Sequence, residues 1–327
     1  MTSLVGHAAA QLAFLSALRS GTLHHAWLLA GPEGVGKATF AHAAALRLLA
    51  EASGGPELPP GLDVPVDHPT RSLADAGSHP DLRILTRLSK TSDTGAETVA
   101  RSITIDQVRG LLPMFATTPA LGPRRVIVID AIDDLERAGA NALLKSLEEP
   151  PAGTIFLLVS HAPGRLLPTI RSRCRTVRFS PLPEDEVRQV LRAALPEAGE
   201  EELAATARAG EGAPGRALRF AGLDVAGLDA AIERLMRQGD PSNAERVKLA
   251  QALSGKSAQA RYEAFLDRAP AAIAAEARTR TGPALRAALD AHRDARDLAG
   301  SAVGLSLDPQ ATVFEMGTIL ARLASPA

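Results

Sequence analysis

The chain has 327 residues, which is enough for two or three domains with cores of their own. Hydrophobic residues make up 46% and charged residues 22%, a composition typical of globular rather than disordered or fibrous proteins. The net charge of −1 gives no sign of nucleic-acid or membrane binding by charge alone, and the single cysteine excludes internal disulfides.

The first apolar stretch, residues 8–18, is not preceded by the basic residues of a signal peptide. No apolar run in the chain approaches the roughly 18 residues that span a membrane. We therefore expect a protein without membrane contact that works in the cytoplasm. Aromatic residues, at 3%, argue against a platform on which nucleic-acid bases stack.

Short apolar runs rich in Val, Ile and Leu predict buried strands at 25–31, 81–85, 124–130 and 154–160. Helical periodicity lies between them, at 37–52 and 138–150. Because the runs are apolar without alternation, we expect a mainly parallel sheet with helices on both faces, hence an α/β fold. Residues 53–80 and 89–100 are predicted to be loops.

After a strand-like run at 176–182, helical segments follow one another to the C-terminus. Their expected boundaries are Pro183, Gly210, Pro214, 239–243, Pro270, Gly282-Pro283 and Pro309. We predict three domains: an α/β P-loop domain at 1–165, a small helical domain at 166–222 and a further all-α domain at 223–327.

The segment GPEGVGKAT at 31–39 lies between a predicted strand and a predicted helix, which is the context of a phosphate-binding loop. Its glycines would let backbone N–H groups approach a polyphosphate, and its lysine would bridge the outer phosphates. These residues are Gly31, Gly34, Gly36 and Lys37. Ala38 stands where a hydroxyl would bind Mg²⁺, and Thr39 points about 100° away from that position. A glycine-rich turn without a ligand is the alternative interpretation.

The run at 124–130 ends in Asp130, whose carboxylate can hold Mg²⁺ through water. ATPases of this type usually place a glutamate beside that aspartate to polarise the attacking water, and here the residue is Ala131. We therefore expect no independent ATPase, with ATP or ADP binding at a degenerate site left open. An active motor ATPase that uses Lys37 and Asp130 is the alternative.

Residues 165–179 are rich in arginine, with Arg165, Arg171, Arg173, Arg175 and Arg178. The run fits a solvated basic edge, a patch for DNA phosphates, or an arginine finger offered to the ATP of another subunit. Composition alone favours the solvated edge. A plain DNA-binding protein is a third functional hypothesis, which the low net charge and few aromatic residues disfavour.

Taken together, five segments resemble the delta prime family of bacterial DNA polymerase III clamp-loader subunits. They are GPEGVGKAT, HPDL at 79–82, ITIDQVR at 103–109, NALLKSLEEPP at 141–151 and RSRC at 171–174. The resemblance covers about the first 220 residues. It implies an AAA+ module of two domains, the second being a lid, followed by a helical collar. It also implies a hetero-pentamer with motor (gamma/tau) and delta subunits, which loads the sliding clamp onto primed DNA.

The resemblance also implies site residues. Arg173 matches the arginine of the family's Ser-Arg-Cys motif, which reaches the ATP of an adjacent motor subunit, and its fixed, charged fork suits that task. Ser160 and Arg216 match two sensor positions, with a strand-end cap and a helix-surface charge as structural alternatives. Cys174 is expected to be a packed residue. The implied role is that of a stator within the DNA polymerase III holoenzyme, a nucleotidyltransferase complex.

Many relatives carry four zinc-binding cysteines in the loop that corresponds to residues 53–80, and this chain has none there. The loop and its flank hold potential ligands without a recognisable spacing: Asp63, Asp67, His68, Asp75 and His79. We predict no zinc and no other bound metal.

Overall fold

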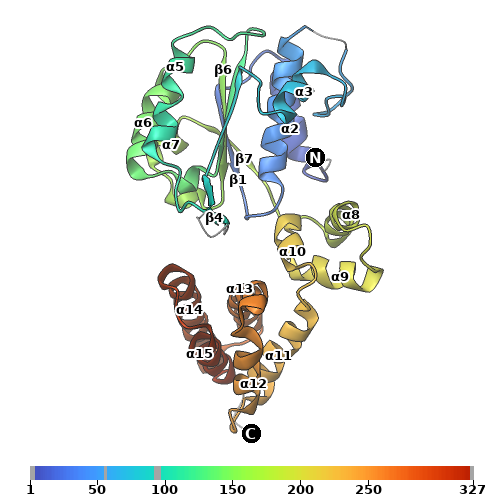
Figure 1. Ribbon diagram of the computed structural model, residues 1–327, viewed down its shortest axis with the longest axis vertical. Coiled ribbons are helices and arrows are strands. Elements are labelled where there is room, and N and C mark those ends of the chain that lie inside the picture. The colour runs from blue at the N-terminus through green and yellow to red at the C-terminus, as the bar shows by residue number, and fades with distance from the viewer. Residues whose placement is uncertain (1–3, 55–56, 92–96, 325–327) are drawn as a thin grey trace. The chain divides into compact units, whose positions relative to one another are not determined.

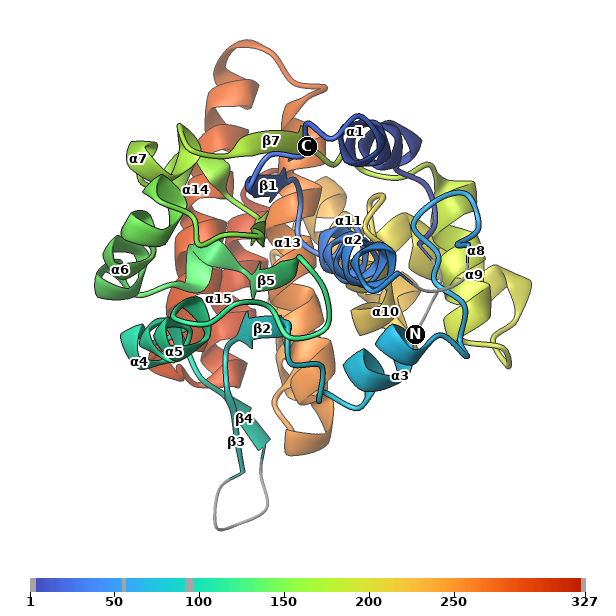
Figure 2. The same ribbon diagram turned by 90° about the horizontal axis from the view of Figure 1, so that it is seen from above.

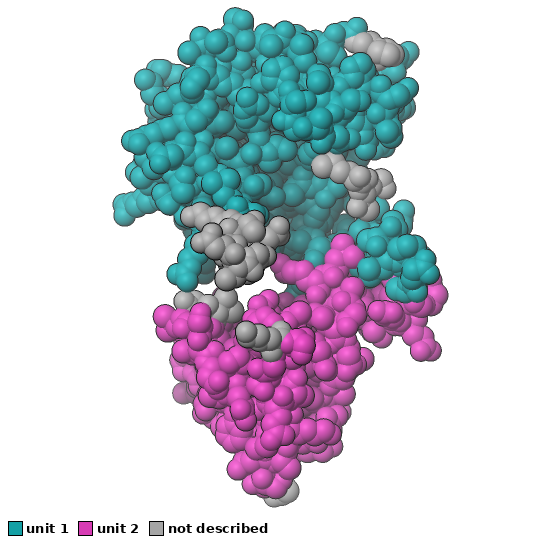
Figure 3. Space-filling view, in the orientation of Figure 1, with its two compact units in different colours: residues 1–198, 211–216 teal, residues 199–210, 217–327 magenta. Residues whose placement is uncertain are grey.

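The computed structural model describes residues 4–54, 57–91 and 97–324 (Figure 1). The chain divides into two compact units, which Figure 3 shows in different colours. Unit 1 consists of residues 1–198 and 211–216, and unit 2 of residues 199–210 and 217–327. The finer domain boundaries at residues 165 and 222 stay predictions.

Unit 1 is built on a five-stranded parallel sheet with the strand order β2-β5-β6-β1-β7. The strands are β1 (Ala26–Ala30), β2 (Leu82–Thr86), β5 (Arg125–Asp130), β6 (Thr154–Ser160) and β7 (Arg175–Arg178). Every residue of β1 and β6 is buried, as the unbroken apolar runs predict. Ala30 pairs with Ser160 and Asp130 with Val159, so the loops that follow β1, β5 and β6 leave from one edge of the sheet.

Helices cover both faces of this sheet, which confirms the predicted α/β class (Figure 2). One side carries α1 (Ala8–Arg19), α2 (Lys37–Ala52) and α3 (Pro69–Asp75), and the other α4 (Ile105–Arg109), α5 (Leu112–Phe115), α6 (Arg137–Glu148) and α7 (Pro168–Arg171). Alternate side chains of β1 enter different cores. Trp27 packs edge-on against Phe14 of α1, whereas Leu28 lies in the core that includes Leu143 of α6. The unit also contains two short 3₁₀ helices, η1 (Ile132–Asp134) and η2 (Pro163–Arg165).

Two segments predicted as loops contain regular structure, so those predictions were wrong in part. Within 53–80, α3 forms because Pro69 occupies its first turn and the His68 ring accepts a hydrogen bond from Thr70 N. Within 89–100, β3 (Ser89–Thr91) and β4 (Glu97–Val99) pair antiparallel. The residues between these two strands lie outside the described part of the chain.

From residue 184 to residue 324, the secondary structure is helical. Unit 1 includes α8 (Glu184–Ala194), α10 (Pro214–Phe220) runs from unit 1 into unit 2, and unit 2 holds α9, η3 and α11 to α15. Their bounds are α9 (Glu200–Ala209), α11 (Val225–Gln238), α12 (Ala244–Leu253), η3 (Lys256–Ala258), α13 (Gln259–Ala277), α14 (Gly282–Leu305) and α15 (Pro309–Ala321). A single core around Phe265, Leu320 and Ile232 joins the longer helices of unit 2.

Most of the expected helix boundaries in the second half are confirmed, with one exception. Pro270 lies inside α13, where it is buried, instead of ending the helix. A proline removes one backbone hydrogen bond, but the apolar face of this 19-residue helix packs into the core on both sides of it. Among the described residues, no helix has the length and apolarity that a bilayer crossing requires.

Candidate functional site

The phosphate-binding loop joins β1 to α2 at the carboxyl edge of the sheet. Gly34 and Gly36 have φ angles of 76° and 111°, which only glycine adopts without strain. A Cβ atom at Gly31 would lie 2.3 Å from Phe179 O, and one at Gly34 would lie 2.7 Å from Arg216 N. Packing within the protein therefore requires glycine at positions 31 and 34, and the backbone conformation favours it at position 36.

The loop's lysine is bonded to the loop. Lys37 Nζ donates to Gly31 O at 2.7 Å and also to Pro32 O, and only 2% of the residue is exposed. Burial lowers the pKa of Lys37 to about 8, although the carboxylates of Asp130, Asp133 and Glu33 act in the opposite direction. The ammonium group expected to bridge phosphates is satisfied by main-chain carbonyls of its own loop.

Two further carbonyls of this loop accept hydrogen bonds from the protein. Gly215 N donates to Gly34 O, and the His7 ring bonds through Nε2 to Val35 O, each at 2.8 Å. Arg216 is thereby held beside Gly34, but its guanidinium donates to Glu211 Oε2 at 2.8 Å. The backbone of Arg216, a predicted sensor residue, therefore lies next to the phosphate-binding loop, while its side chain forms an ion pair with Glu211.

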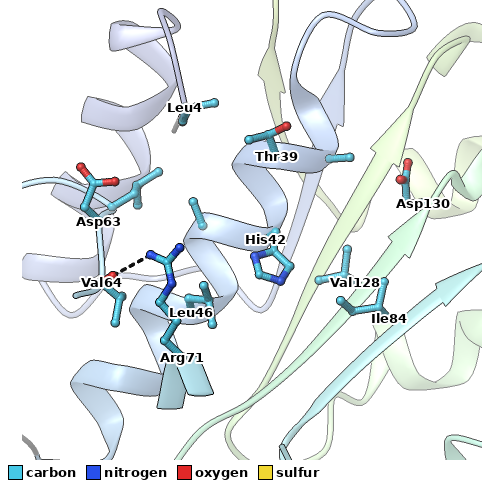
Figure 4. A pocket seen from close by; sticks show the side chains of 13 residues that line it. Leu4, Thr39, His42, Leu46, Asp63, Val64, Arg71, Ile84, Val128 and Asp130 are labelled. Carbon is cyan, nitrogen blue, oxygen red and sulfur yellow. Dashed lines mark hydrogen bonds between the residues drawn. The ribbon is translucent and has the colours of Figure 1, made fainter. Parts of the chain in front are cut away.

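Asp130 lies at the end of β5, where burial raises its carboxyl pKa while His161 and Lys37 favour the charged form. It lines a cavity of about 480 Å³ together with Ala38 and Thr39 of α2 (Figure 4). Ala131, in the position of the water-polarising glutamate, is 2% exposed and belongs to the core. The carboxyl edge of the sheet thus has one carboxylate that could hold Mg²⁺, Asp130, but no general base at position 131.

Ser160, the other sensor candidate, is fully buried and donates from Oγ to Asp133 Oδ1 at 3.0 Å. Asp133 also accepts from the backbone N–H groups of His161 and Ala162, at 2.6 and 3.1 Å. Sequence reasoning missed this role of Asp133, since nothing distinguishes it from the other acids that follow Asp130. Its contacts fix the turn after β6 without any ligand.

The arginine run begins at η2 and extends through α7 into β7, and its members have different environments. The Arg175 guanidinium lies 4.9 Å from the centre of the Trp27 ring. Arg171 and Arg178 line a groove of about 1060 Å³ that reaches the start of the phosphate loop. Arg173 is 32% exposed and bonds to Glu148 Oε1 and Thr169 O, at 2.5 and 2.8 Å.

Cys174 follows Arg173 and is packed against the core beside α6. Burial raises the pKa of its thiol to about 12, so the nucleophilic thiolate is scarce at neutral pH. Within the described ranges, no cluster of three or more His, Cys, Asp or Glu side chains could hold a metal ion. The rings of His68 and His79 each accept a local backbone hydrogen bond, from Thr70 N and Asp81 N. The absence of zinc stays a prediction.

The part of the chain that contains the sheet, the phosphate-binding loop and the turn around Arg173 also matches a known protein family in sequence. Residues 6–183 match the model of a family described as "DNA polymerase III, delta subunit", which covers more than half of the chain. The chain belongs to this family. Its parallel-sheet α/β region is followed by helical regions, as the sequence predicted, while the assignment to the AAA+ class stays a prediction. The family match includes the phosphate loop, Asp130, Ser160 and Arg173, and ends before Arg216.

Curated proteins from other bacteria have similar sequences. The DNA polymerase III subunit delta' of Pseudomonas aeruginosa is 35% identical over 219 residues, which are 65% of this chain and 62% of that protein. The subunit tau of Salmonella typhimurium is 34% identical over 188 residues, 58% of this chain and 26% of that protein. This family member therefore spans less than two thirds of either relative.

Among solved structures, a DNA polymerase III gamma subunit-related protein of Thermotoga maritima aligns with 95% of this chain and 98% of its own, with 17% identity and a TM-score of 0.44.

Proposed function

We propose that this delta-family chain is a stator-type delta prime subunit of a DNA polymerase III clamp loader. It acts in the cytoplasm in a hetero-pentamer with motor (gamma/tau) and delta subunits, and through that assembly it helps to load the sliding clamp onto primed DNA. Unit 2 supplies most of the helical collar. In this role the chain hydrolyses no ATP of its own and offers Arg173 to the ATP of a neighbouring motor subunit.

One observation carries the proposal that the chain's own site is inactive. Lys37 is buried and bonded to the carbonyls of its own loop, while the position of the catalytic glutamate is the buried Ala131. A nucleotide would have to draw the ammonium group away from two carbonyls, and no carboxylate at that position would then activate water. Arg173, by contrast, is partly exposed on a short turn and carries a charge that suits a γ-phosphate.

The test is ATP hydrolysis by the chain alone and by the loader reconstituted with its motor and delta subunits. We expect no hydrolysis by the free chain and the same result for Lys37→Ala. In the complex, the Arg173→Ala subunit should assemble normally yet lower the hydrolysis rate at the adjacent motor site about 10³-fold or more. Total ATP turnover should then fall by the fraction that this one site contributes. Arg171→Ala, which removes an exposed arginine from the same turn, is the matched control.

The similarity to subunit tau favours one other candidate, an active motor ATPase. That function requires hydrolysis by the free chain that is lost in Lys37→Ala and Asp130→Asn. Such a result would refute the stator proposal. Unchanged hydrolysis of the complex with Arg173→Ala would refute the arginine finger.

A further inference from the structure

Glu148 is the last residue of α6 and bonds through Oε1 to Arg173 Nη2 at 2.5 Å. An acidic side chain at a helix C-terminus is disfavoured by the negative end of the helix dipole. Glu149, the next residue, adds a second negative charge at the same end. The ion pair with Arg173 offsets this local cost, so the contact with Arg173 gives a reason for an acidic residue at this helix end.

Both partners extend from backbones that are fixed by the core. Leu147, before Glu148, is 1% exposed, and its carbonyl accepts a hydrogen bond from His25 Nε2 at 3.0 Å. On the other side, Arg173 N donates to the carbonyl of the buried Ile170 at 3.1 Å. The two side chains therefore meet across anchored ends of α6 and α7.

The arginine is held at two points of its guanidinium. Nη2 bonds to Glu148 and Nη1 donates to Thr169 O at 2.8 Å, while the side chain remains 32% exposed. An arginine has five N–H donors, so hydrogen atoms remain available for an incoming anion. The carboxylate is 48% exposed, and a pair this open is too weak to keep the arginine from a polyphosphate.

We propose that Glu148 is a positioning residue for the Arg173 finger, which it orders in the free subunit before a neighbour's nucleotide arrives. This inference rests on the proposed finger role of Arg173. An unrestrained arginine loses most of its rotamer freedom when it binds a phosphate, and a guanidinium that is already oriented loses less. The benefit appears in the turnover of the assembled loader rather than in the stability of the chain.

The experiment measures the rate of ATP hydrolysis by the reconstituted loader at saturating ATP. It also measures the concentration of this chain that gives half of the full rate. The reference quantity is the Arg173-dependent part of the rate, which is the difference between the rates of the wild type and of Arg173→Ala. We expect Glu148→Ala to lower this part about fivefold, because the pair orders roughly half of the arginine's rotamer freedom. Glu148→Gln, which keeps a neutral acceptor, should lose less.

Three controls separate positioning from a structural role. Glu149→Ala removes an equal charge from the adjacent exposed residue and should leave hydrolysis unchanged. Glu148→Ala should keep the melting temperature and the half-maximal concentration of the wild type. In the Arg173→Ala background, Glu148→Ala should have no further effect, because it acts through the arginine.

The outcomes distinguish this inference from the proposed function. If Arg173→Ala leaves hydrolysis unchanged, the finger itself is refuted and Glu148 has nothing to position. If Arg173→Ala lowers hydrolysis but Glu148→Ala equals the wild type, positioning alone is refuted. Faster hydrolysis with Glu148→Ala would show a restraint that opposes the finger, which also overturns the inference.

Discussion

Replacement of Arg246 by alanine should strongly destabilise unit 2. Arg246, in the first turn of α12, donates from its backbone N and from Nε to Asp240 Oδ2, at 3.0 and 3.1 Å. Its Nη1 donates to Thr318 Oγ1 of α15 at 2.8 Å, and its guanidinium lies 5.0 Å from the ring centre of Phe314. One side chain thus joins the turn before α12 to α12 and α15.

The magnitude follows from what the truncation leaves behind. Asp240 is 8% exposed, and removal of one partner from a buried ion pair costs about 3–5 kcal/mol. The backbone N–H groups of Glu245 and of residue 246 still reach its carboxylate, at 3.4 and 3.0 Å, so we expect the lower end, about 3 kcal/mol. Arg246→Lys keeps the charge without the planar fork, so its stability should lie between that of the wild type and that of Arg246→Ala.

Asp240 gives this prediction a pH dependence. Burial acts to raise its pKa, but the hydrogen bonds from Arg246 and Glu245 outweigh it, so the pKa of the folded state is lowered. The stabilisation is therefore present above the unfolded pKa of about 3.9 and is lost as the pH falls through the folded value. In Arg246→Ala the loss of stability between these two values should be smaller.

The chain provides a separate probe for each unit. Its only tryptophan, Trp27, is buried in unit 1, and its only tyrosine, Tyr262, is buried in unit 2. In a urea titration, Arg246→Ala should move the tyrosine near-ultraviolet transition to lower urea with an unchanged slope, while tryptophan fluorescence keeps its midpoint.

Arg293 serves as the control, since it is 66% exposed and pairs with Asp290 on the surface. Arg293→Ala should cost no more than about 1 kcal/mol. A loss below about 1 kcal/mol in Arg246→Ala, or an equal shift of both transitions, would refute the reasoning.

Three further predictions concern unit 1. The pKa of Lys37 is about 8 in the folded chain and about 10.4 when unfolded, so its burial costs stability below pH 8 and the cost is relieved as the pH rises between these values. Melting temperatures across this range should therefore rise for the wild type relative to Lys37→Met, and parallel curves would contradict the burial of the charge. Asp81, 1% exposed, accepts from Ala120 N and Leu121 N at 2.8 Å, and its carboxylate faces Arg125. Asp81→Asn should cost about 2–4 kcal/mol in the Trp27 transition, whereas a near-neutral result would mean that the amide satisfies the same donors. Cys174, with a thiol pKa of about 12, should react with iodoacetamide at neutral pH far more slowly in the folded than in the urea-unfolded chain. Equal rates, followed by mass spectrometry, would show that the thiol is not buried.

The sequence predicted the sheet better than the segments between its strands. The runs at 124–130 and 154–160 have apolar centres without alternation, residues 126–129 and 155–159, because both faces of a parallel strand are covered, and this signal needs no knowledge of the strand's partners. The helix α3 and the pair of β3 with β4 carry no such signal, because each element is only three to seven residues long. Pro270 was wrongly predicted to end a helix, because the local signal of a proline is strong but the burial of the long helix α13 outweighs one missing hydrogen bond.

The same division holds for the candidate site. The loop from Gly31 to Lys37 and the turn around Arg173 have local spacings that can be read from sequence. The contacts that decide their states are long-range, such as Gly215 to Gly34, Ser160 to Asp133 and Glu148 to Arg173. No local pattern indicates which of many acids or carbonyls will face a given donor.

The contacts at the phosphate loop also bear on whether an ATPase could be rebuilt on this chain. Ala38→Ser and Ala131→Glu would supply the two missing groups, but the longer side chain at position 131 would have to fit where only 2% of the alanine is exposed. Lys37, Gly34 and Ser160 would still hold their present internal partners. Each change made alone would cost packing or a hydrogen bond without completing the catalytic set. If the proposed stator role holds, a gain of hydrolysis would therefore require several substitutions together, and no single substitution among these would create an active ATPase site.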